Sequence, residues 1–168
     1  MFNGDSLKVI EELTKKSWTI PYSVRVDSLT NYSYVKSVND DLIVEPFIEE
    51  AEKKSIEFFE KRENLVAGED IIYKSLISED KKTSVVSIIV DPPGPNKEDQ
   101  NSELINYILG FIEPIKESNE NLDIRLLGNP YLDYISPRIV KAEMPVVMPL
   151  MLLPVSYTHL TLPTIPGV

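Results

Sequence analysis

Cysteine is absent from this sequence of 168 residues, and histidine occurs once, at position 159. Without cysteine there can be no disulfide framework, thiolate metal ligand or cysteine nucleophile, and the redox compartment stays undecided. Basic residues are also few, since 17 Lys and Arg face 27 Asp and Glu, for a formal net charge of −10. Because phosphate contact needs clustered Lys and Arg, we expect no nucleic-acid partner. The length suits one domain of ordinary size.

The last fourteen residues, 155–168, resemble the translation of a sequencing-library reagent. A transposase-type adapter contains GTC TCT TAT ACA CAT CTG ACG CTG CCG ACG, which translates to Val-Ser-Tyr-Thr-His-Leu-Thr-Leu-Pro-Thr, the sequence of residues 155–164. In the same frame a variable sample index would supply residues 165–167, and the reagent would then add Val168 and a stop codon. We expect this adapter-like tail to be non-native, and segments of that kind are excluded from fold reasoning. The alternative is a natural tail rich in Thr, Leu and Pro.

Setting the tail aside removes the only histidine, so residues 1–154 offer neither imidazole metal ligands nor Ser-His-Asp catalysis. Carboxylates remain, but Asp40, Asp41 and Glu45 lack the spacing and the glycine of an EF-hand loop. A nucleophilic serine would need Lys or a carboxylate as its base. The serines considered for that role are Ser6, Ser28 and Ser78. We predict no catalytic, cofactor-binding or metal-binding residue, and no enzyme.

An apolar run of eleven residues, Met-Pro-Val-Val-Met-Pro-Leu-Met-Leu-Leu-Pro, occupies positions 144–154, directly before the tail. A helix that spans the hydrocarbon of a membrane needs about 20 apolar residues, so by length this run could be a buried helix of a soluble protein. Three prolines would each cost about 3 kcal/mol in such a helix, whereas membrane helices tolerate them better. We therefore expect residues 142–154 to be the start of a truncated transmembrane helix that follows a domain at 1–141.

The other end, residues 1–4, has neither a basic region nor an apolar run, so this reading frame shows no signal peptide or leading membrane anchor. Between the two ends, hydrophobic periodicity changes in an orderly way. It predicts helices near residues 6–18, 48–66 and 98–120 and strands near 23–29, 84–91 and 122–128.

Several details accompany these elements. Asp5 is the expected N-cap of the first helix, and Pro21 prevents that helix from continuing. A short additional helix is expected around Ile71 to Ile77. The stretch from Ser84 to Val90 is β-branched and nearly continuous, which is typical of a central strand. The side chains that we expect to be buried are Trp18, Ile88, Ile108 and Leu126.

The order of these elements is helix, strand, helical insertion, strand, helix, strand. One strand placed before the first helix would complete βαββαβ, the split-βαβ or ferredoxin-like unit. We therefore expect an α+β, ferredoxin-like domain that lacks its first strand, which is one of the two central strands of that sheet. A chain cut at both ends would explain a pattern that starts within the motif.

Two blocks carry a resemblance to a known family. Ile-Pro-Tyr-Ser-Val-Arg-Val-Asp-Ser-Leu-Thr-Asn-Tyr at 20–32, followed by Asp-Asp-Leu-Ile-Val-Glu at 40–45, resembles the first extracytoplasmic loop of predicted exporters of the RND superfamily, in the branch related to MMPL proteins. Leu-Ile-Ser at 76–78, Ile-Arg-Leu-Leu-Gly at 124–128 and the proline-containing apolar run fall in the same order. The resemblance covers most of residues 2–153.

The resemblance implies a porter domain on the periplasmic side of a bacterial inner membrane, in an exporter driven by proton motive force. It implies the remainder of the same transporter chain as a partner, a homo-oligomer, and a hydrophobic or lipid-like substrate. The proton relay of such exporters lies in membrane helices outside these residues. Arg25 and Asp27, within the first block, are interpreted as structural charges. The alternative from another class is a soluble extracytoplasmic binding or adaptor module.

Overall fold

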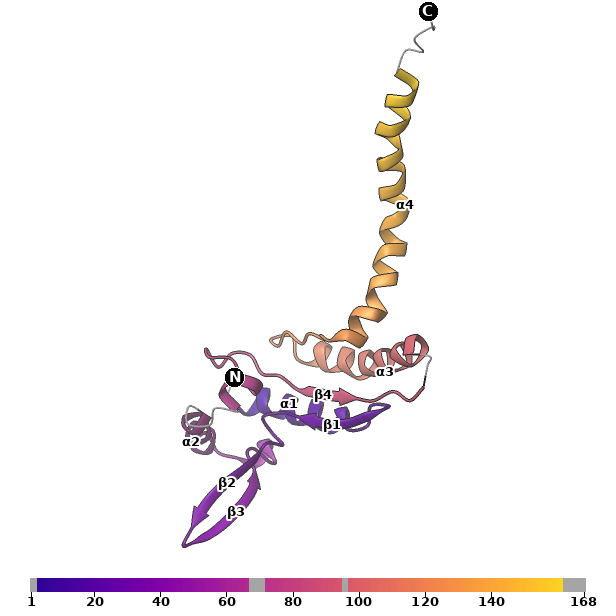
Figure 1. Ribbon diagram of the computed structural model, residues 1–168. Helices are drawn as coiled ribbons and strands as arrows, with labels where there is room; N and C mark the ends of the chain where they lie inside the picture. The colour runs from indigo at the N-terminus through magenta and orange to yellow at the C-terminus, as the bar shows by residue number, and fades with distance from the viewer. Residues whose placement is uncertain (1–2, 67–71, 95–96, 162–168) are drawn as a thin grey trace, which may run out of the picture. The chain divides into compact units, whose positions relative to one another are not determined.

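The computed structural model describes residues 3–66, 72–94 and 97–161, and these form two compact units, Met1–Arg125 and Leu126–Val168. The first unit is α+β, with helices and two small antiparallel sheets (Figure 1). The second is dominated by one long helix. The expected domain boundary at residue 141 falls inside that helix.

The first helix, α1 (Gly4–Ser17), confirms the prediction for 6–18. Asn3 caps it, since its Oδ1 accepts a hydrogen bond from the amide of Ser6 at 2.8 Å. Asp5, the expected N-cap, instead lies in the first turn, where a carboxylate still favours the positive end of the helix dipole. The helix ends at Trp18, which is 50% exposed, so the prediction that Trp18 is buried was wrong.

One sheet pairs β1 (Ser23–Asp27) with β4 (Ser87–Val90) in antiparallel register, with a bulge between Ser23 and Arg25. The strand expected at 84–91 is therefore shorter, and Ser84 instead forms an isolated antiparallel bridge with Ile77. In the part of the chain that the structure describes, β4 has β1 as its single neighbour. The expectation of a central strand at Ser84 to Val90 is thus wrong for these residues, because β4 lies at an edge.

The second sheet is a hairpin that sequence periodicity did not predict. Its strands, β2 (Ser33–Val38) and β3 (Asp41–Pro46), are joined by Asn39 and Asp40. Both joining residues have positive φ, 50° and 69°, as a two-residue type I′ turn requires. The hairpin projects from the rest of the first unit (Figure 1).

The helix expected at 48–66 is divided into a 3₁₀ turn, η1 (Ala51–Lys53), and α2 (Ile56–Val66). The short helix expected near 71–77 is a single π turn, η2 (Ile72–Leu76), while position 71 lies outside the described residues. The longest helix of the first unit is α3 (Lys97–Ser118), which confirms the prediction for 98–120. Its buried stripe is Leu104, Ile105, Ile108, Ile112 and Ile115.

The strand expected at 122–128 is not formed, since the described residues 122–127 have no ladder partner. Their burial nevertheless alternates, and Leu126 is half-buried rather than buried. A segment with strand periodicity cannot pair when no strand lies beside it. Ile108 is buried as expected, whereas Ile88 is half-buried.

The main core of the first unit joins α1, the end of the hairpin and α2. Phe47 is fully buried at the end of β3, and the rings of Tyr32 and Tyr34 meet it edge-on at 6.4 and 5.9 Å between centroids. Leu7 and Ile48 belong to the same cluster. Because α1 also contacts β1, η1 and α3, it links most elements of this unit.

The second unit contains α4 (Asn129–Thr161), whose apolar side chains are exposed. Its segment Asn129–His159 is long and apolar enough to cross a membrane. The last turns of this segment, from Val155 onward, belong to the adapter-like tail, and residues 162–168 lie outside the described part.

Candidate binding site

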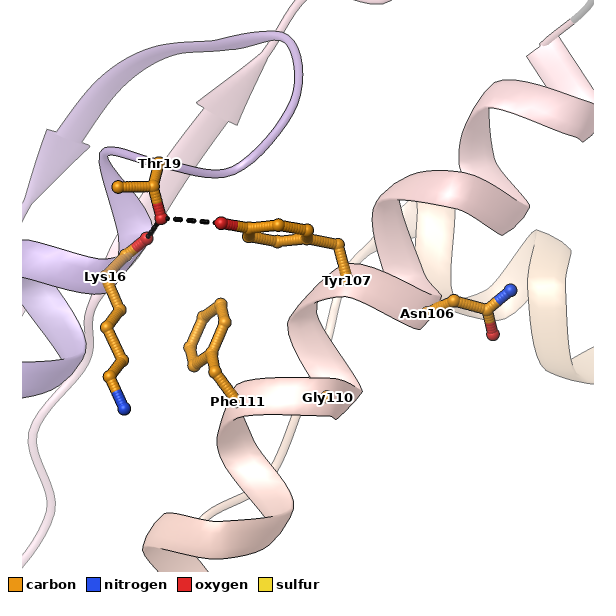
Figure 2. A pocket seen from close by; sticks show the side chains of 6 residues that line it. All are labelled: Lys16, Thr19, Asn106, Tyr107, Gly110 and Phe111. Carbon is orange, nitrogen blue, oxygen red and sulfur yellow. Dashed lines mark hydrogen bonds between the residues drawn. The ribbon is translucent and has the colours of Figure 1, made fainter.

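A shallow groove lies between the end of α1 and the middle of α3 (Figure 2). It has a volume of about 410 Å³. Its lining residues are Lys16 and Thr19 on one side and Asn106, Tyr107, Gly110 and Phe111 of α3 on the other. We refer to it as the α1–α3 groove.

Two aromatic rings give the groove its apolar surface. Tyr107 and Phe111 lie one turn apart on α3, with ring centroids 6.1 Å apart in an edge-to-face arrangement. The hydroxyl of Tyr107 donates to Thr19 Oγ1 at 2.9 Å, and Thr19 Oγ1 donates to the carbonyl of Lys16 at 2.7 Å. These two bonds join α3 to the C-terminal end of α1, so the Tyr107 ring is held in place across the groove (Figure 2).

Gly110 leaves the space beside these rings open. A Cβ atom built at this position would meet no atom within 4 Å, apart from its own helix backbone and chain neighbours. Glycine in a helix interior costs roughly 0.5–1 kcal/mol relative to alanine. A larger side chain at position 110 would therefore fit and would stabilise the helix, and it is the glycine that keeps the groove open.

The chemistry of the groove is that of binding rather than catalysis. Lys16 is its only charged lining residue, and its ammonium lies 2.9 Å from the carboxylate of Glu12 one turn earlier. None of the lining residues is a carboxylate, histidine or cysteine that could act as base or nucleophile. Aromatic rings, two hydroxyls and one partly neutralised cation suit a flat or chain-like apolar ligand.

The charged residues singled out in the sequence do not gather into a site. Arg25 and Asp27 pair with each other on β1, with 2.8 Å between Nε and Oδ2, and both are solvent-accessible. Asp40 and Asp41 lie at the hairpin tip, whereas Glu45 lies near its base, where its oxygens bind Lys36 and Arg62. Among the described residues no group of three His, Cys, Asp or Glu side chains is placed to hold a metal ion.

The three candidate serines have structural surroundings. Ser78 Oγ donates to Asp80 Oδ1 at 2.6 Å inside a tight loop, and Ser6 is a buried residue of the first turn of α1. Ser28 belongs to a buried cluster of three hydroxyls in which Thr14 Oγ1 lies 2.8 Å from Ser28 Oγ and 3.1 Å from Thr30 Oγ1. The side chains of Ser28 and Ser78 are thus engaged with other hydroxyls, with Asn31, and with Asp80 and the carbonyl of Thr83.

The block Ser-Leu-Thr-Asn at 28–31 thus has a packing role. Asn31 Oδ1 accepts from the amide of Ser28 at 2.8 Å, and Asn31 Nδ2 donates to the carbonyl of Val26 at 2.7 Å. Leu29 is fully buried in the main core. Together with Thr14 of α1, these residues fix the turn that follows β1, so a block that stands out in the sequence stabilises the fold rather than forming a pocket.

The pKa values of Glu45 and Glu11 are both lowered, for different reasons. Hydrogen bonds from Lys36 and Arg62 lower the pKa of Glu45. Burial acts to raise the pKa of Glu11, but the hydrogen bonds from Lys15 and from the amide of Ala51 outweigh it and the net shift is downward. Both carboxylates are therefore held ionised as parts of the scaffold, and neither lines the α1–α3 groove.

Sequence periodicity missed the groove. Tyr107, Gly110 and Phe111 lie on the flank of the α3 stripe, where exposed residues are expected. The available signal was two aromatic residues at i and i+4 with a glycine between them in a helical pattern. Comparisons with protein-family models, curated proteins and solved structures find no match to this chain.

Proposed function

We propose that this chain is part of a proton-driven exporter of the RND superfamily and contributes a substrate-contacting and packing surface on the periplasmic side of the inner membrane. The observation that carries the proposal is α4, whose apolar side chains are exposed in the described residues and whose part before the adapter-like tail is residues 129–154. An exposed helix of that length and composition is stable when lipid or other protein covers it.

The residues at the start of α4 support a membrane position. Tyr131, Tyr134, Arg138 and Lys141 precede the segment without Asp, Glu, Lys or Arg that begins at Met144. Arg138 stacks on the ring of Tyr134, with 3.4 Å between its guanidinium carbon and the ring centroid. Aromatic and basic side chains of this kind are typical of the level of lipid headgroups.

The first unit supports a porter-type fold. In a split-βαβ domain the two strands between the helices are antiparallel neighbours, and both helices cover one face. The pair β1–β4 has that pairing, α1 precedes it, α3 follows it, and α1 contacts α3. The missing first strand of this motif would lie beside β4 and would pair on its other side with residues 122–127. One missing strand would therefore explain both the unpaired edge of β4 and the unpaired segment 122–127.

The test of this proposal is the membrane behaviour of the whole chain. We expect it to sediment with membranes and to resist alkaline extraction, whereas a chain with Val147→Asp and Leu150→Asp should be released. These two substitutions place charges on an exposed apolar surface where the hydrocarbon would lie. A wild-type chain that stays in the soluble fraction would overturn the exporter proposal and favour a soluble binding module.

The α1–α3 groove offers a second readout. A fluorescent apolar probe such as N-phenylnaphthylamine should bind the wild-type chain, and Gly110→Leu should reduce that binding at least fivefold by filling the groove. The matched control is Ser118→Leu, which adds the same side chain at an exposed position of α3 outside the groove. Equal probe binding by wild type and Gly110→Leu would exclude the groove as the binding surface.

A further inference from the structure

One side of α4 carries a row of side chains that recur at alternating steps of four and three residues. Residues with this spacing lie on one side of an α-helix, because each residue turns the chain by about 100°. We call this set the α4 row, and its members are Tyr134, Arg138, Lys141, Pro145, Met148 and Leu152. Along the row the side chains change from aromatic, through cationic, to apolar.

The order of these side chains matters as much as their alignment. Arg138 and Lys141 come in the two turns before Met144, where the segment without Asp, Glu, Lys or Arg begins. Met148 and Leu152 follow on the same side, and both are exposed. At about 1.5 Å per residue, Arg138 and Met148 are separated by about 15 Å along the helix axis. The row therefore places cations at one end of an exposed apolar strip.

The carboxylates of α4 lie off this row. Glu143 comes two residues after Lys141 and is about 160° away from it around the helix. Asp133 is about 140° away from Arg138 and more than one turn earlier. The whole chain has a formal net charge of −10, so a helix side with two cations and no carboxylate is a local reversal of charge. Its electrostatic complement is an anion.

The Arg138 guanidinium is held in a position that suits an anion. Its carbon lies 3.4 Å from the centroid of the Tyr134 ring, and Nη1 donates to the carbonyl of Tyr134 at 2.8 Å. Stacking uses the face of the guanidinium, so further N–H donors at its edge can bind two oxygens of one phosphate. Lys141, exposed on the next turn, adds a second positive charge. Because Arg138 is already ordered, it loses little conformational entropy on binding.

We propose that the α4 row binds an anionic phospholipid, with the headgroup phosphate at Arg138 and Lys141 and an acyl chain along Met148 and Leu152. This inference rests on the proposed function, because it requires α4 to stand in a membrane. A soluble anion would meet the same cations but would leave the apolar half of the row uncovered. A zwitterionic lipid has the same phosphate, but the positive group of its headgroup offsets the attraction to two cations.

The test compares two lipids that have the same acyl chains and differ in headgroup charge. The full chain in neutral detergent is mixed with equal amounts of phosphatidylglycerol and phosphatidylcholine, and bound lipids are counted by native mass spectrometry. Wild type should bind at least about fivefold more phosphatidylglycerol, and Arg138→Gln with Lys141→Gln should bind the two lipids equally. The matched control, Lys82→Gln with Arg125→Gln, removes two exposed cations outside α4 and should keep the preference. Equal binding by wild type, or an unchanged preference in the α4 double variant, would overturn the inference.

A second arm separates a lipid from a soluble phosphate. Glycerol 3-phosphate, which has no acyl chain, should not displace phosphatidylglycerol when added in equal amount, and displacement would overturn the lipid assignment. The sedimentation test keeps the two proposals apart. A membrane-bound chain without the headgroup preference contradicts only the lipid site. A chain that stays in the soluble fraction but prefers phosphatidylglycerol in detergent contradicts the exporter and keeps the site.

Discussion

Arg62 Nη2 lies 2.7 Å from Glu45 Oε1, and this contact joins α2 to the β2–β3 hairpin. The Arg62 side chain is only 10% exposed, so its charge is compensated by the carboxylate and by the aromatic rings around it. Phe58 of α2 adds a third ring at 5.1 Å to those of Tyr34 and Phe47. A single guanidinium therefore organises the part of the core that holds the hairpin.

Replacing Arg62 should destabilise the first unit. Arg62→Met removes the partner of Glu45 and the stacking on three rings, and we expect the free energy of unfolding to fall by about 2–3 kcal/mol. Urea unfolding followed by tyrosine fluorescence measures this. Lys36→Met, which removes the more exposed partner of the same carboxylate, should cost less than about 1 kcal/mol. A smaller loss for Arg62→Met than for Lys36→Met would contradict this account.

Acid should weaken the fold partly through Glu45. Lys36 and Arg62 hold its pKa below the ordinary value of 4.5, so the unfolded chain binds a proton more readily than the folded one. This stabilisation is present above pH 4.5 and is lost as the pH falls through the lowered pKa of the folded state. Urea midpoints measured from pH 7 to pH 3 should therefore fall less steeply for Glu45→Gln than for wild type. Glu117→Gln, an exposed change on α3, should follow wild type.

The buried hydroxyl cluster should be sensitive to loss of one member. Thr14→Val keeps the shape but removes the oxygen that lies 2.6 Å from the carbonyl of Ile10 and within 3.1 Å of Ser28 and Thr30. We expect a loss of about 1–2 kcal/mol in thermal or urea unfolding, because buried hydroxyls lose a partner. The same substitution at the exposed Thr83 should change stability by less than about 0.5 kcal/mol. Equal effects at both positions would show that the cluster contributes nothing.

The hairpin turn can be improved. Asp40 has a φ of 69°, which glycine adopts without the steric cost that a side chain brings. Asp40→Gly should raise the stability of the hairpin by about 0.4–1 kcal/mol, measurable as slower amide hydrogen exchange in β2 and β3. Asp41→Gly, a matched change one residue later within the strand, should lower it. Stabilisation by both would argue against the type I′ turn.

Removal of the adapter-like tail should have almost no effect on the first unit. On the adapter interpretation, residues 155–168 were not selected to pack against it, so their deletion should leave its free energy of unfolding unchanged, within about 0.5 kcal/mol. Source DNA amplified without library reagents should differ from the present coding sequence after the Pro154 codon. It should encode further apolar residues there in place of the tail. DNA that still encodes the tail would show that the adapter interpretation is wrong.

Helices with a clear apolar stripe were predictable from the sequence. The stripe from Leu104 to Ile115 has an uninterrupted period, and the helix appears where the period places it. Trp18 was placed wrongly because it follows the last turn of α1, where the period no longer decides which way a side chain points. The N-cap was also misplaced, since Asn3 and Asp5 are equally good capping types and only geometry distinguishes them.

The strands were harder for a physical reason. Val35 and Val44 were not recognised as strand residues because a hairpin with one uncharged exposed face does not alternate in the way that a half-buried strand does. The side chains of residues 122–127 alternate in burial as those of a strand do. A strand also needs a second strand beside it, and the sequence of one segment does not show whether such a neighbour is present. The α1–α3 groove depends on contacts between residues about 90 positions apart, such as Thr19 and Tyr107, and such contacts leave no local signal.

The anchoring of the hairpin through Arg62 also has a mechanical consequence. The paired strands β2 and β3 extend from a base at Ser33 and Pro46 to a tip at Asp40. The ion pair between Arg62 and Glu45 fixes the base to α2. A sideways force on the tip therefore produces a torque at the base, and Arg62 transmits it to α2. A displacement of the hairpin would then be transmitted through the Arg62 guanidinium to the core of the first unit.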